Sequence, residues 1–562
     1  MRRQTLALVM IAAGLAAAPW TIVGGASQRF YKDDPIAREP ETQDASKVEA
    51  WDINLSSDLL LNLFTKPGDL TPNVRAQNIN TIDEVPDSSW FTNRIYAKPV
   101  SIEELKRGPN TIDGPAPGRW TVIRPKTAGA APGFIVRDEK GDVWFLSFDG
   151  KDHPRAATAA IAVACRIFWA LGYYQVESYI TSIDPKNLGV AETARIRTPS
   201  GRVRQMQMKD VRAVLKRSER NSDGTYRVMA GRALPGRVVG GFRFDGTRPD
   251  DPNDVVPHEH RRELRALQVF GGWTNLTDMK AGNTLDSVIT EGGRSFVRHY
   301  LQDVGSSFGT GALEKKDPDD GYEHLYEGAP LVKRMFTLGF YIQPWQYMSY
   351  PKAPEVGRFE GDHFEPEEWK ARVPAAAVTD ARDDDTFWAA LRVMAFTDEM
   401  IRAAVHEGQF GDPNSEKVLG DALIKRRDKI GQVYLTKINP THKFALAGDG
   451  ALSFENAAVR AGFAKPPASG YKAAWSRFDN ATGQTTAIGE TAAPNERIPA
   501  PSGLPSGDGT FVKISVSGVD PGYPSWARPV DVYFRRAGGG WRLVGLDRMP
   551  HMNPAPMSVK KR

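Results

Sequence analysis

DMKAGNTLDSVITEGGRSFVRHYLQDVG, residues 278–305, is the stretch of sequence that decides the fold. Asp278 and Asn283 stand five residues apart at its start. Two apolar-rich arms then flank the turn sequence EGGR at 291–294, which predicts a β-hairpin. Asp303 follows the second arm and opens an Asp-Val-Gly turn. The stretch therefore predicts a polar loop, a hairpin and a second polar loop, with Asp278, Asn283 and Asp303 placed in the two loops.

Upstream of this stretch, residues 119–235 alternate between apolar and polar side chains in a pattern typical of β-strands. One helix, 155–173, interrupts the strands and ends at Gly172. The pattern predicts a small antiparallel sheet with one helix packed on it. The expected strands are 120–124, 133–137, 142–149, 176–183, a hairpin within 194–208, and 225–234.

Residues 236–445 are mainly helical around the hairpin. Apolar residues at helical spacing predict one helix over 260–276, a second over 385–408 and a third over 415–435. The second helix has a break near 396–398, where Thr397 is placed to cap a new helix. A β-rich lobe at 119–235 followed by a helical lobe at 236–445 is the order of a two-lobed protein kinase, so the expected fold class is α+β.

The polar residues of 278–305 fit that architecture chemically. In a kinase one Asp orients the acceptor hydroxyl, an Asn five residues later binds a metal, and an Asp in a DFG-type turn binds metal that bridges the phosphates. Carboxylate and amide oxygens are the ligands that Mg²⁺ prefers. We therefore predict Asp278 as the catalytic residue, and Asn283 and Asp303 as ligands of Mg²⁺ or Mn²⁺ bound with ATP. The alternative is that all three are polar loop residues that cap the hairpin.

Several longer motifs add a resemblance. They are ALGY (170–173), GTRPDDPNDVVPHEHRRELR (246–265), NLTDMKAGNTLD (275–286), RHYLQDVGSSFG (298–309) and VYFRRAGGGWRLVGLDR (532–548). With these motifs the chain resembles a family of uncharacterised bacterial secreted proteins with an atypical kinase-like fold. That family is distantly similar to bacterial toxin kinases and secretory-pathway kinases. The resemblance covers most of the chain from about residue 50 and implies the two-lobed fold. It does not imply an established activity.

The chain departs from the family pattern at three positions. Ser147 stands where the resemblance implies a Lys on the third strand, Ile161 where it implies a Glu on the following helix, and Leu276 where it implies a His. A kinase Lys contacts the α- and β-phosphates, and the Glu holds that Lys in place. The absence of the Lys and the absence of the Glu are consistent with each other, because a Glu without its Lys would be an unpaired buried charge.

Two other lysines are candidates to replace the missing one as nucleotide ligands. Lys151 lies four residues after Ser147, and Lys209 is expected at the end of a neighbouring strand. The alternative is that both are solvated surface lysines. The glycine-rich segment TAGAAPG (127–133) stands where a phosphate loop belongs, but Pro132 lacks a backbone donor, which favours an ordinary turn.

The two ends of the chain differ from the middle. Residues 1–26 combine Arg2 and Arg3, an apolar run and small residues at Gly24 and Ala26, which is typical of a cleavable signal peptide; an uncleaved anchor is the alternative. The prediction places the mature protein in the periplasm or outside the cell. Residues 27–118 read as an extended segment that wraps around a larger domain, and 446–562 as a small β-sandwich.

Other candidate sites are weaker. His258 and His260 could bind a metal with Glu259 or Glu263, but they more simply cap and begin a helix. Trp475, Trp526 and Trp541 could form a sugar-binding platform, although sandwich cores also use Trp. The lone Cys165 stands in an apolar segment and reads as a buried small hydrophobe. A net charge of +5 is too small to indicate nucleic acid, and no membrane span is expected after the signal.

Two functional hypotheses follow. The first is an exported, degenerate kinase-like protein that binds nucleotide and metal with little or no phosphotransferase activity. The second is a non-catalytic binding or scaffold protein of the cell envelope with an unknown protein or glycan partner, where a carbohydrate would bind through the C-terminal sandwich. ATP is scarce outside the cytoplasm, so export favours binding over ATP turnover. Whether the chain is an enzyme stays open, and if it is, it is an atypical ATP-dependent phosphotransferase.

Overall fold

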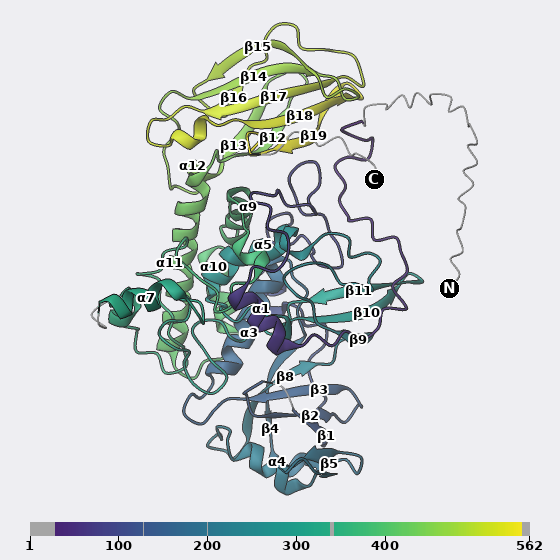
Figure 1. Cartoon of the computed structure of the whole chain (residues 1–562), viewed down its shortest axis with the longest axis vertical. Helices are drawn as coiled ribbons and strands as arrows, with labels where there is room; N and C mark the ends of the chain where they lie inside the picture. Colours follow the sequence, from purple (N-terminus) through teal and green to yellow (C-terminus); the bar gives the residue numbers. More distant parts are fainter. Residues whose placement is uncertain (1–27, 127–128, 199, 338–341, 553–562) are drawn as a thin grey trace, which may run out of the picture.

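The computed structural model describes residues 28–126, 129–198, 200–337 and 342–552. The chain is a mixed α+β protein with one β-sheet region at each end of its long axis and the helices between them (Figure 1). The segment predicted as a signal peptide, 1–26, lies outside the described residues. Within the described ranges, no helix combines the length and the apolar character that a membrane crossing requires.

A six-stranded sheet occupies the end formed by residues 120–232, in the order β4-β8-β3-β2-β1-β5. Four of its five pairings are antiparallel, as predicted, but β5 runs parallel to β1, with Trp120 opposite Leu188. Trp120 and Leu188 share one hydrophobic core, so this pairing buries both side chains. The strands are β1 (Trp120–Pro125), β2 (Gly133–Arg137), β3 (Val143–Phe148), β4 (Ser178–Ile183), β5 (Leu188–Val190) and β8 (Tyr226–Arg232), with β6 (Arg195–Arg197) and β7 (Val203–Gln205) in a separate hairpin.

Helix α3 (Ala156–Leu171) packs between this sheet and the helical region. Its small and apolar side chains are almost all buried, Cys165 among them, and burial raises the pKa of that thiol to about 11. Gly172 ends the helix with a φ of 125°, as the sequence predicted. A Cβ at this position would collide with the ring of Phe91, which comes from the N-terminal segment.

The prediction of one helix over 260–276 is wrong. Two short helices, α5 (Arg262–Arg265) and α6 (Leu267–Thr274), meet at Ala266. At the break the Tyr173 hydroxyl donates to the Glu263 carbonyl oxygen, which a continuous helix would use for its own ladder. A tertiary contact thus interrupts a pattern that looks continuous in sequence.

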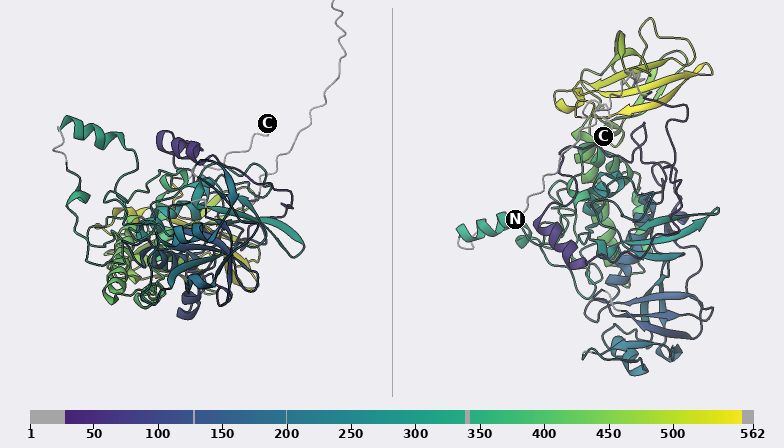
Figure 2. Two further views of the ribbon diagram at one scale, coloured as in Figure 1. Left: turned by 90° about the horizontal axis from the view of Figure 1, so that it is seen from below. Right: turned by 45° about the vertical axis from the view of Figure 1, so that its right-hand side comes forward.

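The other helical predictions hold. The predicted helix with a break consists of α9 (Asp383–Val393) and α10 (Asp398–His406). Thr397 caps the second of them, accepting a hydrogen bond of 3.2 Å from the Met400 N–H. Helix α11 (Pro413–Lys437) follows. The predicted hairpin consists of β10 (Leu285–Glu291) and β11 (Arg294–Tyr300), joined on one side by β9 (Arg237–Gly240). Helix α7 (Gly328–Phe336) stands away from the body in both further views (Figure 2), and α8 (Ala376–Thr379) packs on α5.

Residues 28–118 contain two short helices, α1 (Leu55–Phe64) and α2 (Ile102–Arg107), and pack on both the helical region and the C-terminal strands. Buried charges bind this segment to the body. Arg262 is fully buried and contacts Asp83 of the segment and Asp384 and Asp385 of α9 at 2.9–3.4 Å. Arg262, from the motif at 246–265, thus lies in a buried ionic core that joins the N-terminal segment to α9.

The far end of the chain holds two sheets around one hydrophobic core. Five strands have the order β15-β14-β17-β18-β19 and three have the order β12-β13-β16. Helix α11 leads directly into the first of these strands (Figure 1). The strands are β12 (Thr441–Leu446), β13 (Leu452–Asn456), β14 (Tyr471–Phe478), β15 (Thr485–Ala493), β16 (Arg497–Ile498), β17 (Phe511–Gly518), β18 (Val530–Ala537) and β19 (Gly540–Asp547), with α12 (Ala457–Arg460) after β13.

Candidate functional site

The structure brings Asp278, Asn283 and Asp303 together. Asn283 ends a 3-10 turn, Ala281–Asn283, just before β10, and Asp303 follows β11. The Asn283 side-chain amide donates to the Asp278 carbonyl oxygen at 2.6 Å. The Asp303 N–H donates to the Asn283 carbonyl oxygen at 3.0 Å, and its carboxylate accepts from the Gly305 N–H at 3.1 Å. Asn283 therefore links the loop before the hairpin to the loop after it.

Asp278 carries a paired carboxylate. Its two oxygens lie 2.9 and 3.0 Å from the Lys280 ammonium. Burial works to raise the pKa of Asp278, but Lys280 and the Asn283 amide outweigh it and hold that pKa below its usual value. Asp278 is consequently ionised at neutral pH, which is the state that can orient a hydroxyl and accept its proton.

Asn283 and Asp303 offer oxygen atoms that suit a hard cation. Among the described residues, none donates to the Asn283 amide oxygen and none forms an ion pair with the exposed Asp303 carboxylate. In the same residues, no group of three or more His, Cys, Asp or Glu side chains could hold a metal. The donor set thus fits a Mg²⁺ or Mn²⁺ whose coordination is completed by phosphate oxygens, the usual arrangement for Mg²⁺.

The three departures from the family pattern have different surroundings. Ile161, on α3, contacts the Asp-Val-Gly turn, and a Cβ on Gly305 would lie 2.5 Å from the Ile161 Cγ1. Leu276 is buried in the main hydrophobic core. Ser147 stands on β3 and accepts a hydrogen bond of 3.1 Å from the Lys126 ammonium.

Lys126 was not among the sequence-predicted candidates. It directly follows β1 and precedes the glycine-rich segment 127–133, of which residues 127–128 lie outside the described ranges. Burial lowers its pKa, and the Asp303 carboxylate works in the opposite direction. The signal in the sequence was a lysine next to a segment rich in small residues, which local pattern alone does not distinguish from a surface lysine.

Lys151 and Lys209 are the two lysines that the sequence predicted as nucleotide ligands. Both are exposed, and neither pairs with Asp278, Asn283 or Asp303. The prediction that Lys209 ends a strand is wrong, because it lies in helix α4 (Met208–Leu215). Asp210 accepts the Gln207 N–H at 2.9 Å, which caps a helix start at this point.

His258 and His260 are structural. Both rings are buried, and all four ring nitrogens have protein partners. His258 contacts the Asp254 carboxylate at 2.8 Å, and His260 contacts the Asp69 carboxylate at 3.0 Å. They form the turn that immediately precedes α5, as the helix-start interpretation predicted.

The three tryptophans of the C-terminal region do not share an exposed platform. Trp475 and Trp526 are buried, with ring N–H groups that donate to Thr491 and to the Thr436 carbonyl oxygen at 2.7 and 3.0 Å. Trp541 packs partly against the hydrophobic core that contains Trp475, with Arg536 over its ring. Two of the three side chains thus serve packing.

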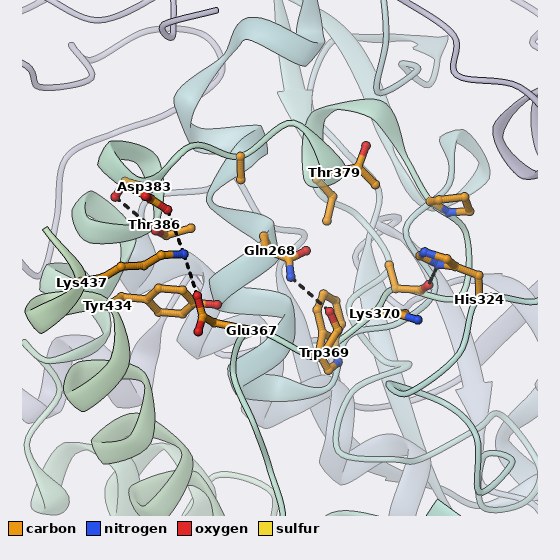
Figure 3. Close-up of a pocket in the computed structure, with 14 residues that line it drawn as sticks. Gln268, His324, Glu367, Trp369, Lys370, Thr379, Asp383, Thr386, Tyr434 and Lys437 are labelled. Atoms are coloured by element: carbon orange, nitrogen blue, oxygen red, sulfur yellow. Dashed lines mark hydrogen bonds and ion pairs between the residues drawn. The ribbon is translucent and has the colours of Figure 1, made fainter. Parts of the chain in front are cut away.

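Two cavities occur elsewhere in the helical region. One of about 300 Å³ is lined by Gln268, His324 and Trp369, and by Lys437, which bridges Glu367 and Asp383 (Figure 3). A second, of about 380 Å³, lies between residues 66–74 and 374–383. Neither cavity is lined by Asp278, Asn283 or Asp303, so neither belongs to the candidate site.

Comparison with known proteins gave structural neighbours alone. No family model matches the chain, and no curated protein matches it. A crystal structure of the Golgi casein kinase is 10% identical with a TM-score of 0.28, covering 58% of this chain and 74% of that chain. The same kinase with Mn/ADP bound is 11% identical with a TM-score of 0.29, covering 70% and 94%. Scores this low carry no argument about activity, and the family resemblance stays a prediction.

Proposed function

We propose that this chain is an exported, degenerate kinase-like protein. In this proposal it binds a nucleoside triphosphate together with Mg²⁺ or Mn²⁺ and has little or no phosphotransferase activity. The observation that carries the proposal is the pair of hydrogen bonds at 2.6 and 3.0 Å by which Asn283 holds Asp278 and Asp303 at one site. These are the residues whose order and spacing indicated a phosphoryl-transfer site in the sequence.

The residues have distinct roles in the proposal. Asn283 and Asp303 hold the metal, which when bound neutralises charge on the phosphates. Asp278, kept ionised by Lys280, is placed to orient an acceptor hydroxyl. Two features oppose efficient transfer: Ile161 supplies no carboxylate at the Asp-Val-Gly turn, and the buried Leu276 supplies no polar group.

The experiment is a thermal-shift titration of the mature chain with ATP, ADP and adenosine, each with Mg²⁺, with Mn²⁺ and with EDTA. A nucleotide present at 100 times its dissociation constant should add about 2.7 kcal/mol to the free energy of unfolding. The metal alone should give a much smaller shift, because the protein supplies one free carboxylate and one amide oxygen. No shift with any nucleotide would contradict the proposal.

Turnover and export need separate measurements. Mass spectrometry of the chain after incubation with ATP and metal should show little or no added phosphate, and rapid autophosphorylation would refute the degenerate part of the proposal. For export, the mature N-terminus should be found near residue 27 in the periplasmic or extracellular fraction. An intact N-terminus in the cytoplasmic fraction would refute it.

A further inference from the structure

Ser147 stands where the family pattern has a strand lysine, and a different lysine, Lys126, contacts it. Ser147 lies on β3, and its hydroxyl accepts a hydrogen bond of 3.1 Å from the ammonium of Lys126. Lys126 belongs to the segment after β1, two strands away in the order β3-β2-β1. An ammonium therefore lies beside the position that lacks a lysine in the sequence.

The path of the Lys126 side chain depends on β2, the strand between Lys126 and Ser147. Gly133, on β2, pairs with Ser147 on one side, and its neighbour Phe134 pairs with Pro125 on the other. A Cβ on Gly133 would lie 2.9 Å from the Lys126 Cδ and would collide with the Leu146 carbonyl oxygen. The absent side chain at 133 thus leaves the space through which Lys126 crosses β2.

Within the part of the chain that the structure describes, the charge on Lys126 has no matching anion. Among the described residues, no carboxylate lies within ion-pair distance of its ammonium, and its hydrogen-bond acceptor is a neutral hydroxyl. The nearby Asp303 carboxylate acts on it electrostatically without forming an ion pair. A partly buried cation that lies beside the position of the missing strand lysine and lacks a counter-ion among the described residues is suited to an anionic ligand.

We propose that Lys126 contacts the phosphates of the bound nucleotide, in place of the strand lysine that Ser147 replaces, and that Ser147 positions it. This inference rests on the proposed nucleotide binding and names the cation that the proposal otherwise lacks. It also accounts for Ile161. A lysine that comes from the end of β1 and is held by the Ser147 hydroxyl does not depend on a carboxylate from α3 for its position.

The test measures affinity by calorimetry for ATP and for adenosine, both with Mg²⁺, in wild type and variants. Lys126→Met should lower the affinity for ATP by about tenfold or more, because it removes a charge-assisted contact. The same variant should leave adenosine binding unchanged, since adenosine has no phosphates. Lys151→Met is the matched control: it removes an exposed lysine of the same lobe and should bind both ligands as wild type does.

A relocation variant sharpens the test. Lys126→Met combined with Ser147→Lys returns the ammonium to β3 and should restore ATP affinity to within a few-fold of wild type. If Lys126→Met binds ATP as wild type does, or loses adenosine affinity to the same extent, the inference is wrong while the proposed function stands. If wild type itself binds neither ligand, the proposed function fails, and the inference fails with it.

Discussion

Replacing Arg262 with Met removes the central cation of the buried ionic core. In the wild type, the guanidinium lies 2.9 Å from Asp385, 3.0 Å from Asp83 and 3.4 Å from Asp384, and it is fully buried. Burial alone would lower the pKa of Arg262, but the carboxylates outweigh it and raise that pKa. Methionine replaces only the aliphatic part of the arginine side chain and carries no charge, so the variant leaves three buried carboxylates without their shared partner.

The size of the loss follows from the remaining contacts. Breaking a buried ion pair by removing one partner costs about 3–5 kcal/mol. Each carboxylate keeps a second cation within 3.1 Å, which places the cost near the lower end, at about 3 kcal/mol. These second pairs are Asp385 with Arg265, Asp83 with Arg75, and Asp384 with Arg382. Because the unfolding entropy grows with chain length, a loss of this size should lower Tm by roughly 3 °C.

The assay is urea unfolding followed by tryptophan fluorescence, together with limited proteolysis of residues 28–118. Because Asp83 belongs to this segment, the variant should be cleaved there faster than wild type. The control is Arg402→Met, which breaks a pair with Asp421 whose side chains are 51% and 33% exposed, and should cost less than about 1 kcal/mol. If Arg262→Met unfolds within about 1 kcal/mol of wild type, the ionic core does not stabilise the fold as we infer.

Three further predictions concern the site, the pH dependence and the C-terminal region. Asp303→Ala should abolish the metal dependence of the nucleotide thermal shift, because it removes the proposed carboxylate ligand; a shift that EDTA still weakens as in wild type would show that the metal is held elsewhere. Burial, helped by the nearby Arg548 charge, lowers the pKa of His442 from 6.5 to about 3, so the folded state resists a protonation that the unfolded state accepts. Stability should therefore fall as the pH drops below 6.5, and the His442 share of that loss should reach about 2 kcal/mol by pH 5. His442→Gln should lose that much less stability than wild type over this range, and equal urea-unfolding profiles would rule the effect out. Trp526→Ala should destabilise the chain by about 3–5 kcal/mol, because it empties a buried site against α11 and removes the hydrogen bond to Thr436; a calorimetric unfolding profile identical to wild type would contradict this.

Local features were predicted well because they depend on neighbours in sequence. The hairpin around EGGR, the Thr397 cap and the glycine that ends α3 each follow from a few adjacent residues. The single helix over 260–276 was predicted wrongly because the Tyr173 hydroxyl, far away in sequence, takes the Glu263 carbonyl oxygen. The parallel pairing of β5 with β1 was missed for a related reason, since pairing direction depends on where the chain returns.

For the candidate site, the sequence alone identified Asp278, Asn283 and Asp303 as candidates to bind a cation or orient a hydroxyl, because chemistry and spacing are properties of the chain itself. It also determined that Ser147 and Ile161 lack the expected charges. The tertiary structure alone decided that Asn283 hydrogen-bonds to both loops, and that Lys126, rather than Lys151 or Lys209, lies beside Ser147. The physical reason is reach: a lysine side chain can cross a neighbouring strand where a glycine leaves room, and no local pattern records which lysine does so.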